Sequence, residues 1–195
     1  MIKITQEEYR LSNWSGGTTT QLLIWPPSAD YRSRNFAFRI SSATVEQEES
    51  TFTSLPGVHR FLSVLDGTLQ LTVKQKCQEQ VIFLNENEVY EFEGDWEVRS
   101  KGQVRDFNLM LKDCNGSMEQ IELKHNDKII CEREFGFLFV VNGDATIRNL
   151  NIEEAIKLNE GESVFDHLDQ KTEYLIQTQQ KCSAFFIQAG ELMNA

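Results

Sequence analysis

One arginine lies within an apolar run that reads as a β-strand, and its charge could bind a carboxylate. Along residues 58–65 alternate side chains face opposite sides of a sheet, which groups Arg60 with Val58, Leu62 and Val64. The pattern therefore predicts that the guanidinium points into an apolar interior. A buried guanidinium needs an anionic or carbonyl partner to offset its desolvation, so either the protein or a bound ligand must supply one.

A second strand-like run, Val104 to Leu111, carries polar residues on the face that reads as inward, namely Asp106 and Asn108. In one hypothesis Asp106 is the internal counter-ion of Arg60, because buried arginines are usually paired. In the other, Arg60 binds a ligand carboxylate through two parallel hydrogen bonds, and Asp106 and Asn108 shape the pocket. The two hypotheses are compatible. A further arginine, Arg39, lies on a polar face and is predicted at a rim or sheet edge.

The segment Ser15 to Thr20 is small, rich in hydrogen-bond donors and placed just before a strand-like run. Gly17 would let backbone N–H groups approach a ligand, and Thr18 and Thr19 would donate hydrogen bonds to it. The segment is not a Walker loop, because the lysine and the following helix are missing. The alternative is a plain turn that leads into a threonine-rich strand.

The histidines are too dispersed to suggest a metal site or a bound cofactor. His59, His125 and His167 are far apart, and no His-x-His or His-x-x-x-His pair occurs. A rival hypothesis is an enzyme: a metal-independent isomerase or hydrolase that acts on a small acidic or sugar-like substrate, with Asp106 or His59 as the general base. The alternation of side chains places His59 on the face opposite Arg60, which disfavours it.

These residues must be positioned by β-structure, since apolar or alternating runs of β-forming residues recur at short intervals. The clearest runs are Gln21 to Trp25, Phe36 to Ser42, Arg60 to Leu65, Leu69 to Val73, Val81 to Leu84, Val104 to Leu111, Phe137 to Val141, Tyr174 to Thr178 and Ala184 to Gln188. One segment, Ile152 to Leu158, contains good helix formers, but its alignment with a strand-like segment in the repeat described next favours a strand.

The chain contains two copies of one β unit. Phe61 to Gly67 recurs as Phe137 to Gly143, an offset of 76 positions (137 − 61), and Leu84 to Glu86 recurs 74 positions later (158 − 84). Near-equal offsets in two separate matches indicate a duplicated unit. Each copy has an Asp-Gly or Asn-Gly pair that predicts a hairpin turn. The same offset from Arg60 leads to Gly136, so only one copy has the charge.

Two short β units, each too small to cover a sheet face well alone, indicate an all-β bicupin of two antiparallel, jelly-roll-like barrels packed together. We predict a first barrel at residues 1–113, with the ligand pocket, and a structural second barrel at 114–195, because the polar, turn-rich stretch at 113–117 suits a junction. Sheet edges in such folds often pair, which leaves a homodimer open.

The composition of the chain disfavours some classes of binding partner. A net charge of −11 opposes binding to nucleic acid or to an anionic membrane, and no apolar run approaches the length of a membrane span. Cys77, Cys114, Cys131 and Cys182 show no Cys-x-x-Cys spacing, which is typical of reduced packing thiols in a cytoplasmic protein. The inward-facing Arg60, rather than the composition, predicts a small acidic metabolite as the partner.

Four motifs together resemble the HutD/Ves family, in the family's order: Asn13 to Leu22, Phe38 to Val45, Phe52 to Arg60 and Arg105 to Met110. The resemblance implies a metal-free bicupin from the bacterial cytoplasm. For the HutD branch it also implies control of histidine breakdown through sensing of urocanate, formylglutamate or formate. On this resemblance Arg60 is the pocket arginine, the glycine-threonine loop lines the pocket, and Asp106 and Asn108 belong to the family's Asp-Phe-Asn signature.

The leading hypothesis is thus a protein that binds a small carboxylate in its first barrel with little or no catalysis. Arg60 would hold the charge, Thr18 and Thr19 would donate hydrogen bonds, and Asp106 and Asn108 would orient the arginine or a polar substituent. A third possibility is a structural or partner-binding protein with a vestigial cavity, which an Arg60 fully engaged by Asp106 would support.

Overall fold

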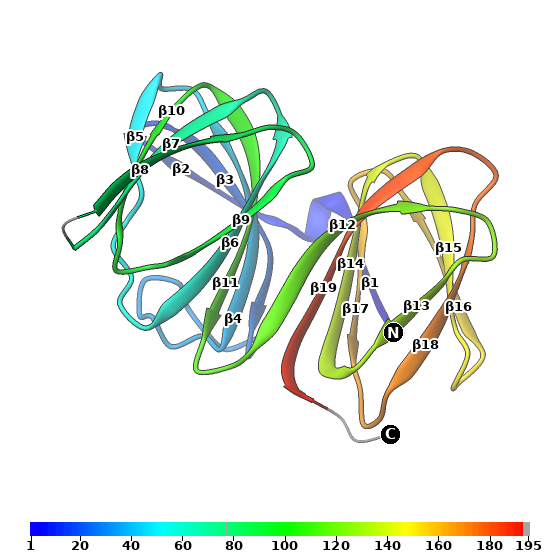
Figure 1. Cartoon of the computed structure of the whole chain (residues 1–195). Helices are drawn as coiled ribbons and strands as arrows, with labels where there is room; N and C mark the ends of the chain where they lie inside the picture. The colour runs from blue at the N-terminus through cyan, green and yellow to red at the C-terminus, as the bar shows by residue number, and fades with distance from the viewer. Residues whose placement is uncertain (77, 193–195) are drawn as a thin grey trace. The chain divides into compact units, whose positions relative to one another are not determined.

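The computed structural model describes residues 1–76 and 78–192, and it divides the chain into two compact units. The first unit spans Tyr9–Asp113, and the second combines Met1–Glu8 with the chain from Cys114 onward. Both units consist of two antiparallel sheets that face each other (Figure 1), the arrangement of a cupin-like barrel. The all-β prediction is confirmed.

The first unit has a six-stranded sheet in the order β2-β3-β4-β11-β6-β9 and a four-stranded sheet in the order β5-β10-β7-β8. Its strands are β2 (Arg10–Trp14), β3 (Gly17–Trp25), β4 (Phe38–Val45), β5 (Glu49–Thr51), β6 (Val58–Asp66), β7 (Leu69–Gln75), β8 (Gln78–Leu84), β9 (Val89–Glu93), β10 (Glu97–Lys101) and β11 (Val104–Lys112). A buried apolar cluster joins the sheets, with Leu62 and Val64 from β6, Leu71 from β7 and Phe92 from β9 among its members.

The second unit has a five-stranded sheet in the order β1-β17-β14-β19-β12 and a four-stranded sheet in the order β13-β18-β15-β16. Its elements are β1 (Ile2–Ile4), the 3-10 turn η1 (Gln6–Glu8), β12 (Gly116–Leu123), β13 (Lys128–Cys131), β14 (Arg133–Asn142), β15 (Asp144–Asn149), β16 (Glu154–Asn159), β17 (Ser163–His167), β18 (Thr172–Gln177) and β19 (Cys182–Leu192). Among the described residues η1 is the single helical element, far shorter than a bilayer crossing requires.

The internal repeat is visible as matching strand order. The sequence β9-β6-β11-β4 in the first unit corresponds to β17-β14-β19-β12 in the second, and β5-β10-β7-β8 corresponds to β13-β18-β15-β16. Turns occur at both predicted places, where Gly67 and Gly143 have positive φ, at 95° and 85°. The hairpin prediction is wrong, because each turn joins strands of different sheets, β6 to β7 and β14 to β15. The segment with helix-forming residues is strand β16, because its pairing with β15 outweighs local helix propensity.

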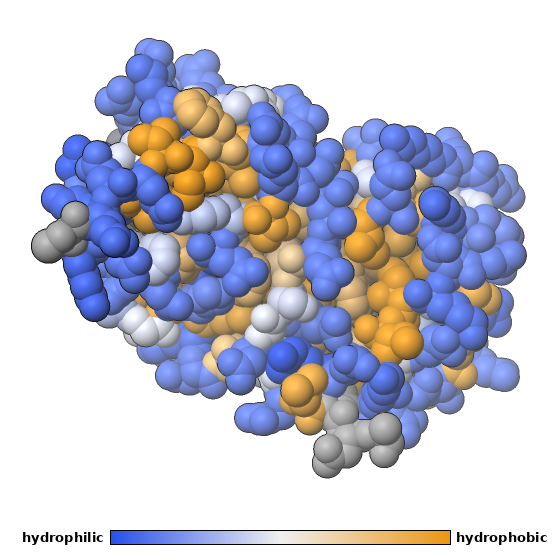
Figure 2. Space-filling model, in the orientation of Figure 1, coloured by the Kyte–Doolittle hydropathy of each residue, from blue (hydrophilic) through white to orange (hydrophobic). Residues whose placement is uncertain are grey.

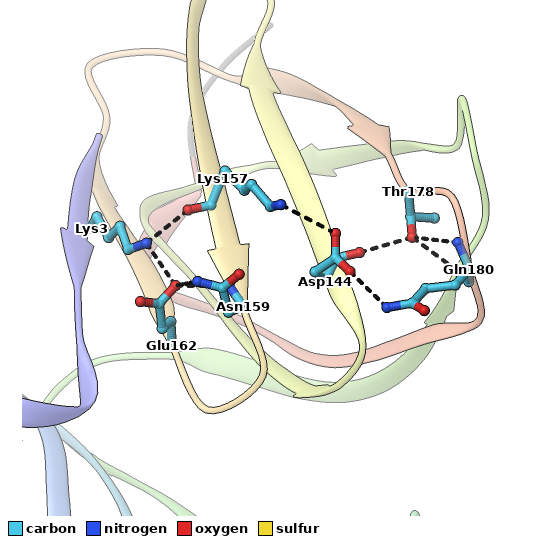
Figure 3. A network of polar contacts seen from close by, with 7 residues as sticks. All are labelled: Lys3, Asp144, Lys157, Asn159, Glu162, Thr178 and Gln180. Carbon is cyan, nitrogen blue, oxygen red and sulfur yellow. Dashed lines mark hydrogen bonds and ion pairs between the residues drawn. The ribbon is translucent and has the colours of Figure 1, made fainter.

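The predicted first barrel at 1–113 needs one correction, because residues 1–8 belong to the second unit. Strand β1 pairs antiparallel with β17, with Ile2 opposite Phe165. Figure 3 shows how Lys3 is held there: its Nζ donates to the backbone oxygen of Lys157 at 3.0 Å and lies 2.6 Å from Glu162 Oε2. This strand completes the edge of the five-stranded sheet, which the repeat alone could not reveal.

The cysteines that the structure describes are thiols, as predicted. Burial raises the pKa of Cys131 and of Cys182 to about 11, which keeps both protonated as packing residues. Cys77 lies outside the described residues. On the surface, Figure 2 shows mainly hydrophilic residues, with an apolar area over the sheet that ends in β8, where Val81 and Phe83 are exposed.

Candidate functional site

Arg60 lies on the inner face of β6 with only 4% of its surface exposed, which confirms the predicted burial. It stands opposite Met110 in β11 and Phe92 in β9. Its Cζ lies 4.7 Å from the ring centroid of Phe52 and 5.0 Å from that of Phe92. Two aromatic faces therefore contact the guanidinium, an arrangement that attracts a cation.

Asp106 does not form the direct ion pair with Arg60 that the first hypothesis proposed. Its Oδ1 accepts a hydrogen bond from the backbone N–H of Ala43 at 3.0 Å, and among the described residues no carboxylate oxygen lies within 4.0 Å of the Arg60 guanidinium. Burial raises the pKa of Asp106 to about 6, while the Ala43 N–H and the charges of Arg60 and Arg39 act in the opposite direction.

Two buried polar atoms on this inner face have no hydrogen-bond partner among the described residues. They are Nε of Arg60 and Oδ1 of Asn108. Asn108 stands opposite Leu62, one inward position along from Arg60. Burial lowers the pKa of Arg60 to about 10. Unpaired buried donors and acceptors cost stability, and in native proteins they point to a ligand, an ion or water that completes them.

Arg39 also belongs to this inner face, so the prediction of a rim or edge position is wrong. It is 5% exposed, and β4 lies between β3 and β11 inside the sheet. Its Nε donates to Gln21 Oε1 at 2.9 Å and its Nη1 to Ser41 Oγ at 3.1 Å. Its Cζ stacks 4.3 Å from the ring centroid of Tyr31. In the register of the sheet Arg39 stands opposite Met110, which stands opposite Arg60.

A connecting segment between β3 and β4, residues 26–37 and here called the cap, brings Tyr31 and Arg34 to the two inner arginines. The Cζ of Arg34 lies 4.3 Å from the Tyr31 ring centroid, and its buried Nη1 has no partner among the described residues. Lys112 Nζ holds the cap by donating to the backbone oxygen of Arg34 at 2.5 Å. Sequence reasoning missed the cap because it is neither a strand nor a recognisable motif.

The predicted donor loop is largely a strand. Gly17, Thr18 and Thr19 begin β3, and the turn before it is Ser15-Gly16. Thr19 stands opposite Ala43, in the row that includes Asp106, whereas Thr18 occupies the alternate face of the strand. The structure therefore separates Thr18 from the inward-facing group, and the alternative of a turn leading into a threonine-rich strand is the one observed.

Gly17 has a structural reason to be glycine. Its φ is 147°, and a Cβ added there would lie 2.0 Å from the backbone oxygen of Thr44. The residue allows the close approach of β3 and β4 rather than leaving backbone N–H groups open to a ligand.

His59 lies on the outer face, as its position in the alternation predicted. Its Nδ1 is 2.9 Å from Glu93 Oε1 and its Nε2 is 3.3 Å from Glu91 Oε2. The structure thus does not bring His59 together with Asp106 as an acid and a base. His125 contacts the backbone oxygen of Thr178, and in the described part of the chain no group of three potential metal ligands occurs.

The second unit has a glycine at the position of Arg60 and a carboxylate at the position of Phe92. Gly136 stands opposite Asp166 in β17, as Arg60 stands opposite Phe92 in β9. The glycine found from the repeat therefore does replace the arginine in three dimensions, and a carboxylate replaces the aromatic ring.

Side chains of the second unit itself engage that carboxylate. Asp166 Oδ2 accepts hydrogen bonds from Tyr174 Oη at 2.9 Å and from Asn149 Nδ2 at 3.1 Å. A Cβ on Gly136 would lie 3.2 Å from Cys131 Sγ and 3.4 Å from Tyr174 Oη. A cavity of the second unit, lined by Gly136, Asp166, Tyr174 and apolar side chains, lies where the first unit has the arginine side chain.

Comparison with known proteins agrees with this architecture. A crystal structure of the conserved protein of unknown function PA5104 from Pseudomonas aeruginosa PAO1 is 19% identical, with a TM-score of 0.86 over 97% of this chain and 98% of that one. HutD from Pseudomonas fluorescens SBW25, in a formate condition, is also 19% identical, with a TM-score of 0.76 over 97% and 99%.

More distant similarity extends to the wider cupin fold. Oxalate decarboxylase from Lactobacillus farciminis, as a formate complex, is 7% identical with a TM-score of 0.71, covering 100% of this chain and 87% of that one. At these identities the likeness concerns the fold. No curated protein sequence matches the chain. The family model HutD matches residues 6–185, nearly the whole sequence and both units. The chain is a member of the HutD family.

Proposed function

We propose that the first unit binds a small carboxylate or formyl compound, of the class that includes formate, urocanate and formylglutamate. The observation that carries this proposal is the buried guanidinium of Arg60, which has an unpartnered Nε and no carboxylate within 4.0 Å among the described residues. A negatively charged ligand would supply the missing hydrogen bond and offset the desolvated charge.

Membership of the HutD family supports a role for this binding in the control of histidine utilisation in the cytoplasm. The solved HutD structure in a formate condition is a relative in which the smallest member of the ligand class was present. In this proposal Arg60 binds the carboxylate, Asn108 Oδ1 accepts a hydrogen bond from a polar substituent, and the ring faces of Phe52 and Phe92 hold the guanidinium in place. In this proposal the ligand binds on the inner face of the first unit, and the second unit is structural.

Isothermal titration calorimetry with formate, urocanate and formylglutamate tests the proposal. The wild-type chain should bind at least one of them, and Arg60→Met should abolish the binding. The matched control is Arg105→Met, because Arg105 lies exposed on β11 of the same unit. Absence of binding to all three compounds, or equal binding by the Arg60→Met protein, would refute the proposal.

A further inference from the structure

The inner face of the second unit carries a carboxylate without a lysine or arginine beside it. Asp166 is buried on β17 opposite Gly136, and among the described residues no lysine or arginine nitrogen lies within 4.0 Å of its oxygens. Its Oδ2 accepts hydrogen bonds from Tyr174 and Asn149, and both donors are neutral. These bonds orient the carboxylate but leave its negative charge, which a buried carboxylate normally shares with a cation.

The cation that does reach this carboxylate is shared with another acid. The ammonium of Met1 lies 3.5 Å from Asp166 Oδ1, but it is closer to Glu154 Oε2, at 3.0 Å. Among the described residues two carboxylates therefore share one ammonium. Burial, and after it the charge of Asp166, raises the pKa of the Tyr174 hydroxyl, so this negative charge is felt inside the unit. The contact with Met1 also shows that an ammonium group fits beside Asp166.

A cavity adjoins Asp166, and most of its wall is apolar or aromatic. Gly136, Ile147, Tyr174 and Phe186 are among the residues that line it. It has room for about one water-sized group. Apolar walls favour a small alkyl group, and aromatic faces attract a cation. Space, walls and carboxylate together match a small alkylammonium.

The charge of the whole second unit favours a ligand of the same sign. Residues 1–8 and 114–195 contain eight lysines and arginines and sixteen aspartates and glutamates, a net charge of −8 (8 − 16). Residues 9–113 have a net charge of −3 (11 − 14). A strongly negative unit raises the local concentration of cations and repels carboxylates. The second unit therefore selects against the ligand class proposed for the first.

We propose that the cavity of the second unit binds a small primary ammonium compound, with the ammonium on Asp166 and the alkyl group against the apolar walls. This inference goes beyond the proposed function, in which the second unit is structural, and gives that unit a ligand of its own. The carboxylate determines the sign of the ligand charge, and Gly136 provides the room. The two copies of the repeat then bind ligands of opposite charge, because a glycine and a carboxylate replace Arg60 and Phe92.

Proton–nitrogen correlation spectra of the full chain test the inference, with methylammonium, methanol and formate as ligands at equal ionic strength. Methylammonium and methanol have nearly the same size and differ in charge. The amide signals of Gly136 and Tyr174 report the cavity. Methylammonium should shift both signals saturably and bind at least about tenfold more tightly than methanol, because hydrogen bonds between charged groups are the stronger ones. Formate should leave both signals in place.

Three variants locate the site. Asp166→Asn should lose the response to methylammonium, since the charge is gone while the amide oxygen can still accept from Tyr174. Gly136→Ala should weaken binding, followed at the Tyr174 amide, because the added methyl group enters the cavity and lies 3.4 Å from Tyr174 Oη. Asp169→Asn is the matched control and should respond as wild type, because Asp169 is exposed in the same unit.

Equal binding of methylammonium and methanol by wild type would overturn the inference, because the carboxylate would then play no part. The absence of a saturable shift at Gly136 and Tyr174 would overturn it as well, and so would an unchanged response of Asp166→Asn. A formate shift at these two signals as large as that of methylammonium would contradict the selection of cations. The comparison of ligands on wild type decides even if Asp166→Asn does not fold.

Discussion

Replacing Arg60 by methionine should stabilise the ligand-free protein while it abolishes ligand binding. The reason is the uncompensated burial of the guanidinium. Burial lowers the pKa of Arg60 from 12.5 to about 10, and a shift of that size corresponds to about 3 kcal/mol of lost stabilisation of the charged form.

The two aromatic contacts offset part of that destabilisation. A cation over an aromatic face contributes about 0.5–1 kcal/mol or more, and Arg60 has two such contacts, with Phe52 and Phe92. Methionine has a similar length, keeps favourable sulfur contacts with both rings and requires no anionic partner. The expected result is a gain of about 1–2 kcal/mol in the free energy of unfolding.

Urea denaturation followed by tryptophan fluorescence is the suitable assay, because all three tryptophans, Trp14, Trp25 and Trp96, lie in the first unit. Arg105→Met should change the free energy of unfolding by less than about 0.5 kcal/mol, as exposed substitutions usually do. A saturating ligand at about 100 times its dissociation constant should stabilise wild type by about 2.7 kcal/mol and leave Arg60→Met unaffected. A loss of more than about 1 kcal/mol in ligand-free Arg60→Met would refute the reasoning, since it would mean that the guanidinium is already well compensated.

Three further predictions concern the pH, the strand contacts and the first residues. The pKa of Asp106 is about 6 in the folded state, against 3.8 when unfolded, so the folded state keeps this proton to higher pH. The free energy of unfolding of wild type should therefore fall by roughly 2 kcal/mol as pH rises from 4 to 7. Asp106→Asn should lack this slope in urea titrations, and parallel curves for the two proteins would contradict the prediction. Gly17→Ala should destabilise the first unit by more than about 1 kcal/mol, measured by fluorescence, because the added Cβ would meet the backbone oxygen of Thr44. The loss should be larger than for Gly57→Ala, where the space around the added Cβ is open. A larger loss for Gly57→Ala would exclude the contact with Thr44 as the cause. Deleting residues 1–8 should lower the midpoint temperature of unfolding of the second unit, measured by circular dichroism, because β1 pairs with β17. The unfolding transition seen by tryptophan fluorescence, which reports the first unit, should stay unchanged. A shift in the tryptophan transition instead would contradict the assignment of these residues to the second unit.

The burial of Arg60 could be predicted from sequence because it depends only on alternation along one strand. The pattern from residue 58 to 64 fixes which side chains share a face, and the strand has no bulge within that stretch; the register shift opposite β11 comes later, between Arg105 and Asp106. The same reasoning placed His59 outside. The repeat likewise predicted two related β units, and the matching strand orders of the two units agree with it.

Arg39 could not be placed in the same way, because its environment comes from distant parts of the chain. Its local neighbours are polar, which read as a rim, yet Gln21 from β3 and Tyr31 from the cap surround it. The partner of Asp106 was missed for a related reason: the backbone N–H of Ala43 bonds its carboxylate, and a side-chain pattern gives no sign of such a bond. Residues 1–8 were assigned to the wrong unit because β1 pairs with β17, far along the sequence.

Because Gly136 stands in the second unit where Arg60 stands in the first, a half with the arginine and a half without it can be compared within one chain. Both halves share one strand order, yet only the half with the arginine also holds the fluorescent indoles. A titration can therefore follow the half with Arg60 by tryptophan emission, and both halves together by circular dichroism of the backbone, in one cuvette and at one concentration. Any ligand effect that is specific to the guanidinium must appear in the tryptophan signal of wild type and be absent from that of Arg60→Met.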